Sequence, residues 1–318
     1  MQSRMNVLKR ARVSTGEATA GQKGEAAMGK YAVLSMDVED WYHNDYFLNA
    51  PVNKNHKMHD GIDVFLKILD DYTIEATFFV LAEILDEIRD KIREIADRHH
   101  EVACHGLAHT RPLLMAPGLF RKQMVFAKEL LVRASGQEVV GYRAPTYGLD
   151  DAHFKIIREL GFQYDSSRIG FKQNSKYGSF DISAFTEGPR NIYRDGDFFE
   201  FEISTQEAFG MQVPLGGGYF RMLPWAFTKR QLQKHCLNSD VYVLYVHPFE
   251  LSRFPVPMVD GVGMKARIRS TLGRDSVEGK IRQTIEILKE QGFEFITFRR
   301  LRERLIISHK RTFASKAI

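Results

Sequence analysis

Residues 31–37 read YAVLSMD, a run of small and apolar residues of strand length that ends in an acid. Such a run is typical of a strand that is buried on both faces. Five later segments have the same texture: 76–80 (ATFFV), 101–105 (EVACH), 138–145 (EVVGYRAP), 241–246 (VYVLYV) and 293–297 (FEFIT). The sequence therefore predicts a sheet of at least six buried strands.

Helices are expected between these strands. Apolar residues recur at helical spacing over 60–72, 81–99, 118–135, 151–161 and 277–291. Strands that alternate with helices imply right-handed crossovers and a mostly parallel sheet. The expected fold is α/β, a distorted (β/α) barrel. An open doubly wound sheet is the structural alternative.

The pattern changes at three places that set the expected domain organisation. Residues 1–29 have no sustained apolar periodicity and are expected to form a mobile leader before a single domain over 30–300. Within that domain, 171–228 is rich in Gly and aromatic residues and predicts an insertion of loops and hairpins. A helical extension is expected at the C-terminal end, with a basic tail over 301–318.

The formal charge of +5 is concentrated at the two ends of the chain. Residues 1–30 carry a net charge of +4 and residues 299–318 a net charge of +6, which leaves −5 for 31–298. A mildly acidic body argues against a nucleic-acid-binding face. The basic ends favour solvated tails, with contact to a phosphate-rich surface as the alternative.

Two cysteines, Cys104 and Cys236, are too few for a disulfide framework. The longest apolar runs are of strand length, so no segment of the sequence is expected to span a membrane. The leader lacks the apolar region of a secretion signal. These features together predict a protein of the reducing cytoplasm.

Polar, reactive residues follow several of the expected strands. His105 and His109 follow the third strand at a spacing of four, which suits a divalent metal if the segment is helical. Two histidines four apart also occur often by chance. A carboxylate is the missing third ligand, and Asp37, Glu39 and Asp40 follow the first strand. Alternation along a strand puts Asp37 and Glu39 on the same side and Asp40 on the other.

The motifs together resemble the polysaccharide deacetylase family (NodB-like, carbohydrate esterase family 4) over residues 30–300. The branch associated with exopolysaccharide, capsule and O-antigen systems is most similar. It shares DVED (37–40), GYRAP (141–145), GFQYDSS (161–167), GGGYFR (216–221) and HPFE (247–250). The resemblance implies a NodB-like barrel and a hydrolase that cleaves the C–N bond of an N-acetylated sugar.

The resemblance also implies a metal centre. Family members hold a divalent cation, most often Zn, with Co, Ni, Mn or Fe as alternatives. Glu39, His105 and His109 are the expected ligands. The usual first motif has adjacent aspartates, whereas this chain has Asp37-Val-Glu39-Asp40. Asp40 is therefore an alternative third ligand.

Catalytic roles are transferred by the same resemblance. Asp37 is the expected base, held by a bidentate contact with Arg143. Tyr147, or the backbone NH beside it, would bind the oxyanion, and His247 would be the general acid. Asp165 would orient His247, with a turn-capping role as the alternative.

The expected substrate contacts are Leu244 at the acetyl group, the rings of Tyr219 and Trp225 at the sugar, and Pro145. The expected function is metal-dependent deacetylation of an N-acetylated sugar or oligosaccharide, nucleotide- or lipid-linked, in bacterial surface-polysaccharide (including lipopolysaccharide) biosynthesis. Neither nucleic acid nor a transmembrane segment is expected, and an oligomer of identical chains is allowed. The alternatives are hydrolysis of a non-sugar amide, such as a cyclic ureide, and carbohydrate binding without turnover.

Overall fold

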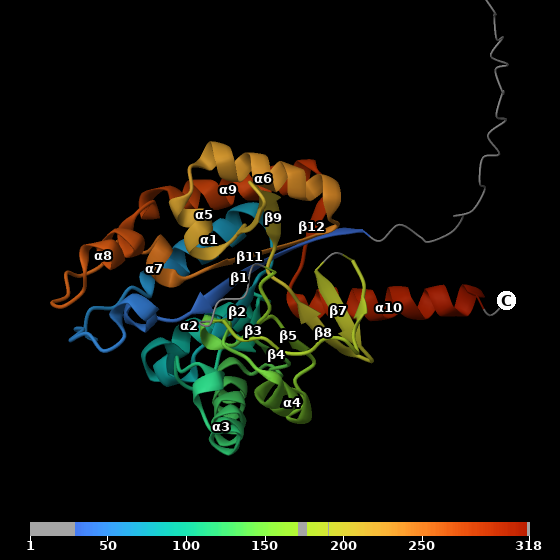
Figure 1. Ribbon diagram of the computed structural model, residues 1–318, viewed down its shortest axis with the longest axis horizontal. Coiled ribbons are helices and arrows are strands. Elements are labelled where there is room, and N and C mark those ends of the chain that lie inside the picture. The colour runs from blue at the N-terminus through green and yellow to red at the C-terminus, as the bar shows by residue number, and fades with distance from the viewer. Residues whose placement is uncertain (1–28, 171–176, 190, 317–318) are drawn as a thin grey trace, which may run out of the picture.

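Strand β1 (Lys30–Val38) pairs with three other strands of a curved ten-stranded sheet in the computed structural model, which describes residues 29–170, 177–189 and 191–316 (Figure 1). The expected leader lies outside the described residues, Gly29 excepted. The other strands of the sheet are β2 (Thr77–Val80), β3 (Glu101–Cys104), β4 (Gly141–Tyr142), β5 (Tyr164–Asp165), β6 (Thr186–Glu187), β7 (Ile192–Asp195), β8 (Phe198–Phe201), β11 (Val241–Val246) and β12 (Phe293–Phe295). Their order is β11-β1-β2-β3-β4-β5-β8-β7-β6, with β12 also paired to β1.

Strands β1 to β5 pair in parallel and in chain order, and β11 pairs in parallel with the opposite edge of β1. A doubly wound sheet would require the strand order to reverse at the first strand, and this order does not reverse there. On the far side, the Val243 amide donates to the Ser204 hydroxyl at 2.8 Å, which links the chain after β8 to β11. The predicted distorted (β/α) barrel is therefore confirmed.

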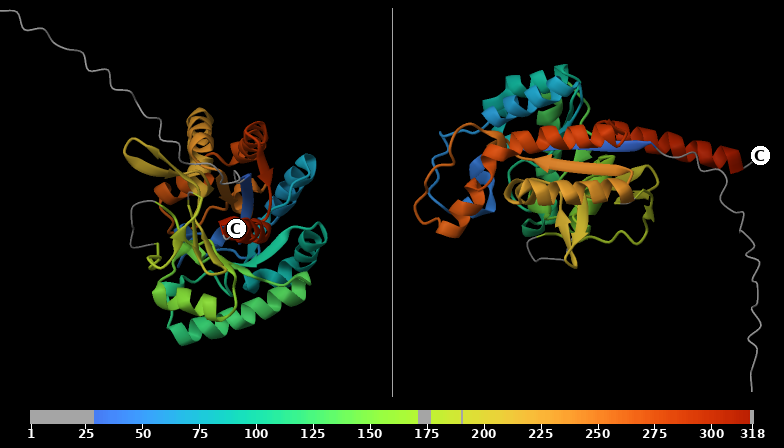
Figure 2. Two further views of the ribbon diagram at one scale, coloured as in Figure 1. Left: turned by 90° about the vertical axis from the view of Figure 1, so that its right-hand side faces the viewer. Right: turned by 90° about the horizontal axis from the view of Figure 1, so that it is seen from above.

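Helices cover the outside of the curved sheet (Figures 1 and 2). They are α1 (Asp60–Tyr72), α2 (Leu85–Asp97), α3 (Pro117–Ser135), α4 (Asp151–Glu159), α6 (Trp225–Asn238) and α9 (Val277–Glu290). The sequence analysis did not predict α6, and the bounds of the other five match the prediction within a few residues. None of the helices in the described part of the chain is both long and apolar enough to span a membrane.

Alternation along the strands separates two cores. On β1, Leu34 and Met36 join the large cluster between sheet and helices, whereas Val33 joins a smaller cluster with Phe79 and Tyr245 inside the barrel. Helix α10 (Phe298–Lys316) closes one end of this interior (Figure 2). The Phe298 ring lies 5.7 Å from the Phe79 ring, centroid to centroid. The predicted C-terminal helical extension thus seals the barrel.

The expected insertion over 171–228 is only partly an insertion. Hairpins are present, because β7 pairs antiparallel with β6 and β8, and β9 (Thr205–Ala208) with β10 (Met211–Pro214). Strand β8, however, pairs in parallel with β5 and belongs to the barrel. The sequence prediction missed β8 because four residues are too short to show a period among so many aromatic neighbours.

The glycines at 216–218 let helix α5 (Gly217–Met222) lie against β11. A Cβ on Gly217 would meet the Tyr245 ring at 2.4 Å, and φ there is +55°. We expect Gly217→Ala to lower the free energy of unfolding by about 1–3 kcal/mol. Gly218→Ala is the matched control, because its nearest neighbour would be 3.7 Å away. Equal thermal melting temperatures for the two variants would contradict this packing.

Candidate active site

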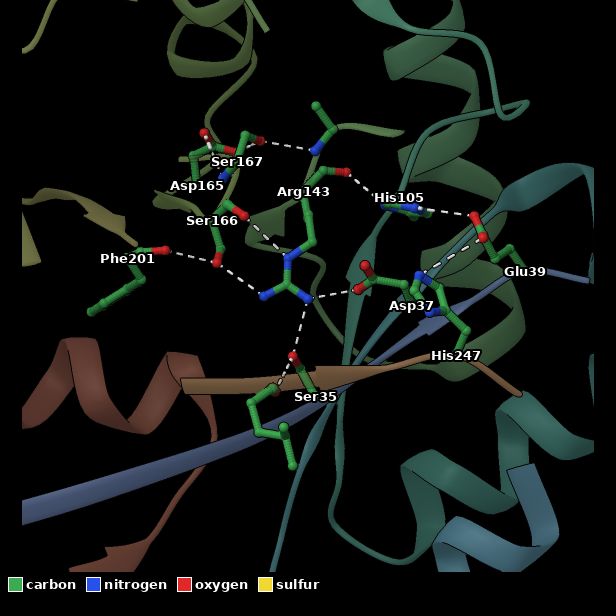
Figure 3. A network of polar contacts seen from close by, with 12 residues as sticks. Ser35, Asp37, Glu39, His105, Arg143, Asp165, Ser166, Ser167, Phe201 and His247 are labelled. Carbon is green, nitrogen blue, oxygen red and sulfur yellow. Dashed lines mark hydrogen bonds and ion pairs between the residues drawn. The ribbon is translucent and has the colours of Figure 1, made fainter. Parts of the chain in front are cut away.

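Four strand ends bring the expected catalytic residues together at one end of the barrel (Figure 3). Asp37 lies in β1 and Glu39 directly after it, while His105 follows β3, Arg143 follows β4 and His247 follows β11. Because the C-terminal ends of parallel strands meet at the same end of a barrel, residues far apart in the sequence become neighbours there.

The Glu39 carboxylate is the centre of this group. Its Oε2 lies 2.7 Å from His109 Nε2 and 3.6 Å from His105 Nε2, and its Oε1 lies 3.9 Å from His247 Nε2. Burial opposes the charge of Glu39, but the charge of His109 and hydrogen bonds from both ligand histidines outweigh it and hold the pKa of Glu39 well below its usual range. The group is an ionised carboxylate facing imidazoles.

The residues from His105 to His109 do not form the expected helical turn. Strand β3 ends at Cys104, and Gly106 has φ +108°, so the segment is a loop. The two imidazoles still converge because His105 is anchored: its Nδ1 lies 2.9 Å from the Arg143 carbonyl oxygen. A carbonyl oxygen only accepts, so Nδ1 donates this bond, and Nε2 is the ring nitrogen directed at Glu39.

These donors fit a divalent metal. Glu39, His105 and His109 each offer one ligand atom, and these atoms lie within 4.8 Å of one another. Two imidazole nitrogens and a carboxylate oxygen are a ligand set that catalytic zinc takes. The anchored Nδ1 of His105 supplies the outer hydrogen bond that metal-ligating histidines need.

The Asp40 side chain points away from this group. Its Oδ1 accepts hydrogen bonds from the backbone amides of Trp41 (2.8 Å) and Met58 (3.1 Å), and its Oδ2 lies 3.2 Å from His59 Nε2. The carboxylate therefore holds the loop after β1 in place. Asp40 as the alternative ligand is not supported by this geometry.

Arg143 is fully buried and holds Asp37. Its Nη1 donates to Asp37 Oδ1 at 2.6 Å and to the Ser35 hydroxyl at 3.0 Å, while Nε and Nη2 donate to the carbonyl and hydroxyl oxygens of Ser166 (Figure 3). The guanidinium also stacks on the Phe79 ring at 4.0 Å. Arg143 therefore makes a single hydrogen bond to Asp37 and not the expected bidentate contact, because Ser35 and Ser166 accept from its other donors.

Glu250 is the partner of His247. Its Oε2 lies 3.0 Å from His247 Nδ1, and its Oε1 accepts from Arg221 Nε at 2.9 Å. Burial alone would lower the pKa of His247, but the hydrogen bond and charge of Glu250, with the charges of Glu39 and Asp37, raise it to about 9. The imidazole is therefore held as an imidazolium at neutral pH.

The expectation that Asp165 orients His247 is wrong. Asp165 Oδ1 accepts from the Ser167 hydroxyl at 2.7 Å, and the carboxylate also contacts Glu200. Sequence reasoning missed Glu250 although HPFE was recognised. The signal that could have revealed it is the spacing: Glu250 comes three residues after His247, and Pro248 lies between them. This is the pattern of a capping box at the start of a helix, here α7 (Pro248–Leu251).

Asp165 and Glu200 form a buried carboxyl pair. Burial raises the pKa of Asp165 to about 6, and burial together with the Asp165 charge raises the pKa of Glu200 well above its usual range. The folded state therefore binds protons more tightly than the unfolded chain. The stabilisation is complete below the ordinary carboxyl pKa of about 4 and is lost as pH rises through about 6.

We expect Glu200→Gln to reduce this pH dependence, because glutamine resembles the protonated acid and removes one of the two charges. Thermal melting at pH 5 and pH 8 should show a smaller loss of stability in the variant than in the unaltered chain. Glu207→Gln, at an exposed glutamate, is the control. The same loss in all three proteins would contradict a shared proton in this pair.

Tyr147 is buried in the turn after β4, where it interacts electrostatically with Arg143 and Asp37. Both Thr146 and Tyr147 have positive φ, at 54° and 56°, an uncommon conformation that concentrates at functional sites. The Tyr147 amide donates to the Ala144 carbonyl, so its backbone NH is already used. Burial raises the pKa of the Tyr147 hydroxyl well above its usual range, which keeps it protonated and able to donate.

The expected substrate contacts are divided by the structure. Leu244 lies in the cluster between sheet and helices. It is three positions before His247, so alternation along the strand directs the two side chains to opposite faces, and this expectation is wrong. Trp225 packs partly buried against the same cluster, and its contact with the sugar stays a prediction. Pro145 is buried, and a Cβ on Gly106 would lie 3.5 Å from its ring, so it supports the His105 loop. Tyr219 is 44% exposed on α5.

A cavity of about 270 Å³ lies beside Tyr147. Ser167, Arg168 and Tyr177 are among the residues that line it. The Tyr219 hydroxyl also acts electrostatically on Tyr177, which places Tyr219 near the same region. The cavity has the size of a single sugar ring and mixes aromatic with polar walls.

Comparison with known proteins gives similarities over different parts of the chain. Residues 55–164 match the model described as polysaccharide deacetylase, and residues 166–303 match a domain of unknown function (DUF3473). A peptidoglycan deacetylase of Helicobacter pylori is 28% identical over 107 residues, and a peptidoglycan deacetylase-like protein of Gibberella zeae is 30% identical over 114 residues. These alignments cover 34% and 35% of this chain, and only 36% and 33% of the two relatives.

Among solved structures, a candidate polysaccharide deacetylase from Mycobacterium smegmatis aligns with a TM-score of 0.61 at 20% identity, over 91% of this chain and 95% of its own. Puue allantoinase aligns with a TM-score of 0.59 at 13% identity, over 88% and 91% of the two chains. Identities this low show the shared fold alone. With the deacetylase relatives, the family match and the barrel lead to one conclusion: residues 55–164 match the polysaccharide deacetylase family, and the chain around them has the fold of a solved deacetylase-like barrel.

Proposed function

We propose that this protein is a metal-dependent hydrolase that removes the acetyl group from an N-acetylated sugar. One observation carries the proposal. The Glu39 carboxylate lies within 4 Å of the two other metal-binding residues, His105 and His109, and of the charged His247. A candidate cation site and a proton donor thus lie next to each other, which suits the activation of an acetyl carbonyl and the protonation of an amide nitrogen.

The metal centre is proposed to consist of Glu39, His105 and His109, with zinc as the favoured ion. A divalent cation bound there would polarise an acetyl carbonyl and acidify water. Glu39 supplies the negative charge, and the Nδ1 anchor of His105 fixes its ring. The protein's own contribution is therefore an ionised carboxylate beside two imidazoles, one of them fixed in its orientation.

Three residues are proposed to move or hold protons. Arg143 occupies Oδ1 of Asp37 and fixes its carboxylate, which accepts a proton from the attacking water. The protonated Tyr147 hydroxyl donates to the oxyanion that forms at the acetyl carbonyl. His247, charged through Glu250, then protonates the sugar nitrogen as the C–N bond breaks. The products are acetate and the free amine.

The finer assignment is to bacterial surface-polysaccharide assembly, such as O-antigen, capsule or exopolysaccharide. The motifs at 37–40, 161–167, 216–221 and 247–250 support this branch of the family. We propose a cytoplasmic protein, which fits the two free, buried thiols of Cys104 and Cys236. A nucleotide- or lipid-linked N-acetylated sugar is the corresponding substrate.

The test is acetate release by the full chain loaded with zinc, using N-acetylglucosamine oligomers as substrates. We expect equal amounts of acetate and free amine, and loss of both after treatment with a chelator. Hydrolysis of a cyclic ureide such as allantoin, without acetate release, would favour the amide-hydrolase alternative. Oligomer binding without either reaction would indicate a carbohydrate-binding protein.

A further inference from the structure

The segment after His247 exposes several large apolar side chains. Five of them form what we call the α8 face: Phe254, Met258, Met264, Ile268 and Leu272, which are 51–80% exposed. Helix α8 (Met264–Thr271) buries only Ser270 among its residues. A helix that does not bury its apolar side chains in its own protein is a candidate for an external apolar environment.

The arrangement on α8 is amphipathic. Met264, Ile268 and Leu272 follow one another at a spacing of four, which places them along one side of the helix. Lys265 and Arg269 form a second row at the same spacing, next to the first, and both are exposed. An apolar row beside a cationic row is the pattern of helices that lie in a lipid–water interface.

The segment around α8 is basic, although the folded body as a whole is mildly acidic. Residues 252–274 contain five Lys and Arg and a single acid, Asp260, for a net charge of +4. The whole of 31–298 has a net charge of −5. Cations therefore accompany the exposed apolar side chains of this segment, and a partner surface with negative charge is favoured.

The α8 face lies at the catalytic end of the barrel. Phe249, Val259 and Val262 pack with Trp41 and Phe47 in one small cluster, so the loop after Glu39 and the segment before α8 share a core. In Figures 1 and 2, α8 lies at the end toward which β1 and β11 point, whereas the free end of α10 lies at the opposite end.

We propose that the α8 face docks on an anionic lipid surface and brings the mouth of the active site to the membrane. The substrate class that follows is an N-acetylated sugar carried by a membrane lipid, and this second step rests on the proposed function. The docking itself does not. Both rows of α8 contribute to docking. The apolar row buries its side chains in the membrane, and the cationic row is attracted to anionic headgroups.

A second copy of the chain is the less favoured occupant. In a two-fold dimer, the same face contacts itself. Lys265 and Arg269 would then approach their own copies, with Asp260 as the one acid of the segment to offset them. An anionic bilayer meets both rows without this repulsion.

The experiment is flotation of the full chain with vesicles of equal parts phosphatidylglycerol and phosphatidylcholine, and with pure phosphatidylcholine vesicles. We expect binding to the anionic vesicles and much weaker binding to the neutral ones. Ile268→Asp should weaken binding by on the order of tenfold or more, because it removes apolar contact and adds a repelled charge. Ile307→Asp on α10 is the matched control, since Ile307 is 49% exposed and Ile268 51%.

The charge row is tested by Lys265→Glu with Arg269→Glu. Lys229→Glu with Arg230→Glu, at exposed positions of α6, is the control with the same change of charge. We expect only the α8 pair to abolish the preference for anionic vesicles. Equal binding by the Ile268→Asp variant and the unaltered chain would overturn the proposal, because the basic ends of the chain would then carry the binding.

Two further outcomes separate the competing explanations. A dimer that is lost in Ile268→Asp, without vesicle binding by the unaltered chain, would assign the face to self-association and overturn the proposal. Acetate release from a water-soluble oligomer should be unchanged in Ile268→Asp. If acetate release is absent from all variants while vesicle binding depends on Ile268, the proposed function fails and the docking proposal stands.

Discussion

Replacing Asp37 by Asn is expected to lower the rate of acetate release by roughly 10²–10⁴-fold, the usual effect of losing a general base. Asparagine is nearly the same size and can still accept from Arg143, so the fold and the bound metal should remain. The measurement is the turnover rate under saturating zinc, with metal content determined on the same sample. A rate restored by excess zinc would contradict the assignment of Asp37 as the base.

His247→Asn is expected to have an effect of similar size, on the order of 10²–10⁴-fold, because the amine is a poor leaving group without a proton. The measurement is turnover on an N-acetylated sugar against an acetyl ester with a good leaving group. The rate of ester hydrolysis should fall far less than the rate on the sugar, since the leaving group of the ester needs no proton. Equal losses on both substrates would contradict a general acid at this position.

Glu250→Gln tests the effect of the Glu250 charge on His247, because glutamine has nearly the same shape without the charge. The variant removes the anion that contributes most to the raised pKa of His247, so the imidazolium loses its proton at lower pH. The alkaline limb of the pH–rate profile should move down by about one unit or more. An unchanged limb, with unchanged thermal stability, would show that Glu250 does not act through His247.

Much of the fold could be predicted because its elements carry strong local signals. Residues 241–246 are an apolar run of strand length, and β11 has those bounds. The apolar spacing over 60–72 likewise gives the bounds of α1. Strand β8 could not be found in this way. Its place in the barrel depends on parallel pairing with β5, which is set by the tertiary structure.

Strand alternation predicts from the sequence which of the acids after the first strand reach the site. Asp37 and Glu39 share the inner face of the first strand and reach the site, whereas Asp40 points outward and caps the loop. The same rule, applied to Leu244 and His247, would have put Leu244 outside the barrel. The hydrogen-bond partners of the catalytic groups were harder to predict from the sequence. Asp165 and Glu250 are both buried acids within recognised motifs, and only the contacts of the folded chain show that Glu250 meets His247.

The most direct test of the proposed metal centre is the zinc content of purified Glu39→Gln beside Asp40→Asn and the unaltered chain. Glutamine keeps the size of Glu39 but removes the charge that balances the cation, so we expect Glu39→Gln to retain little zinc. Asp40→Asn should retain as much zinc as the unaltered chain. Loss of zinc in Asp40→Asn with full occupancy in Glu39→Gln would contradict the account, because the ligand would then be the neighbouring carboxylate.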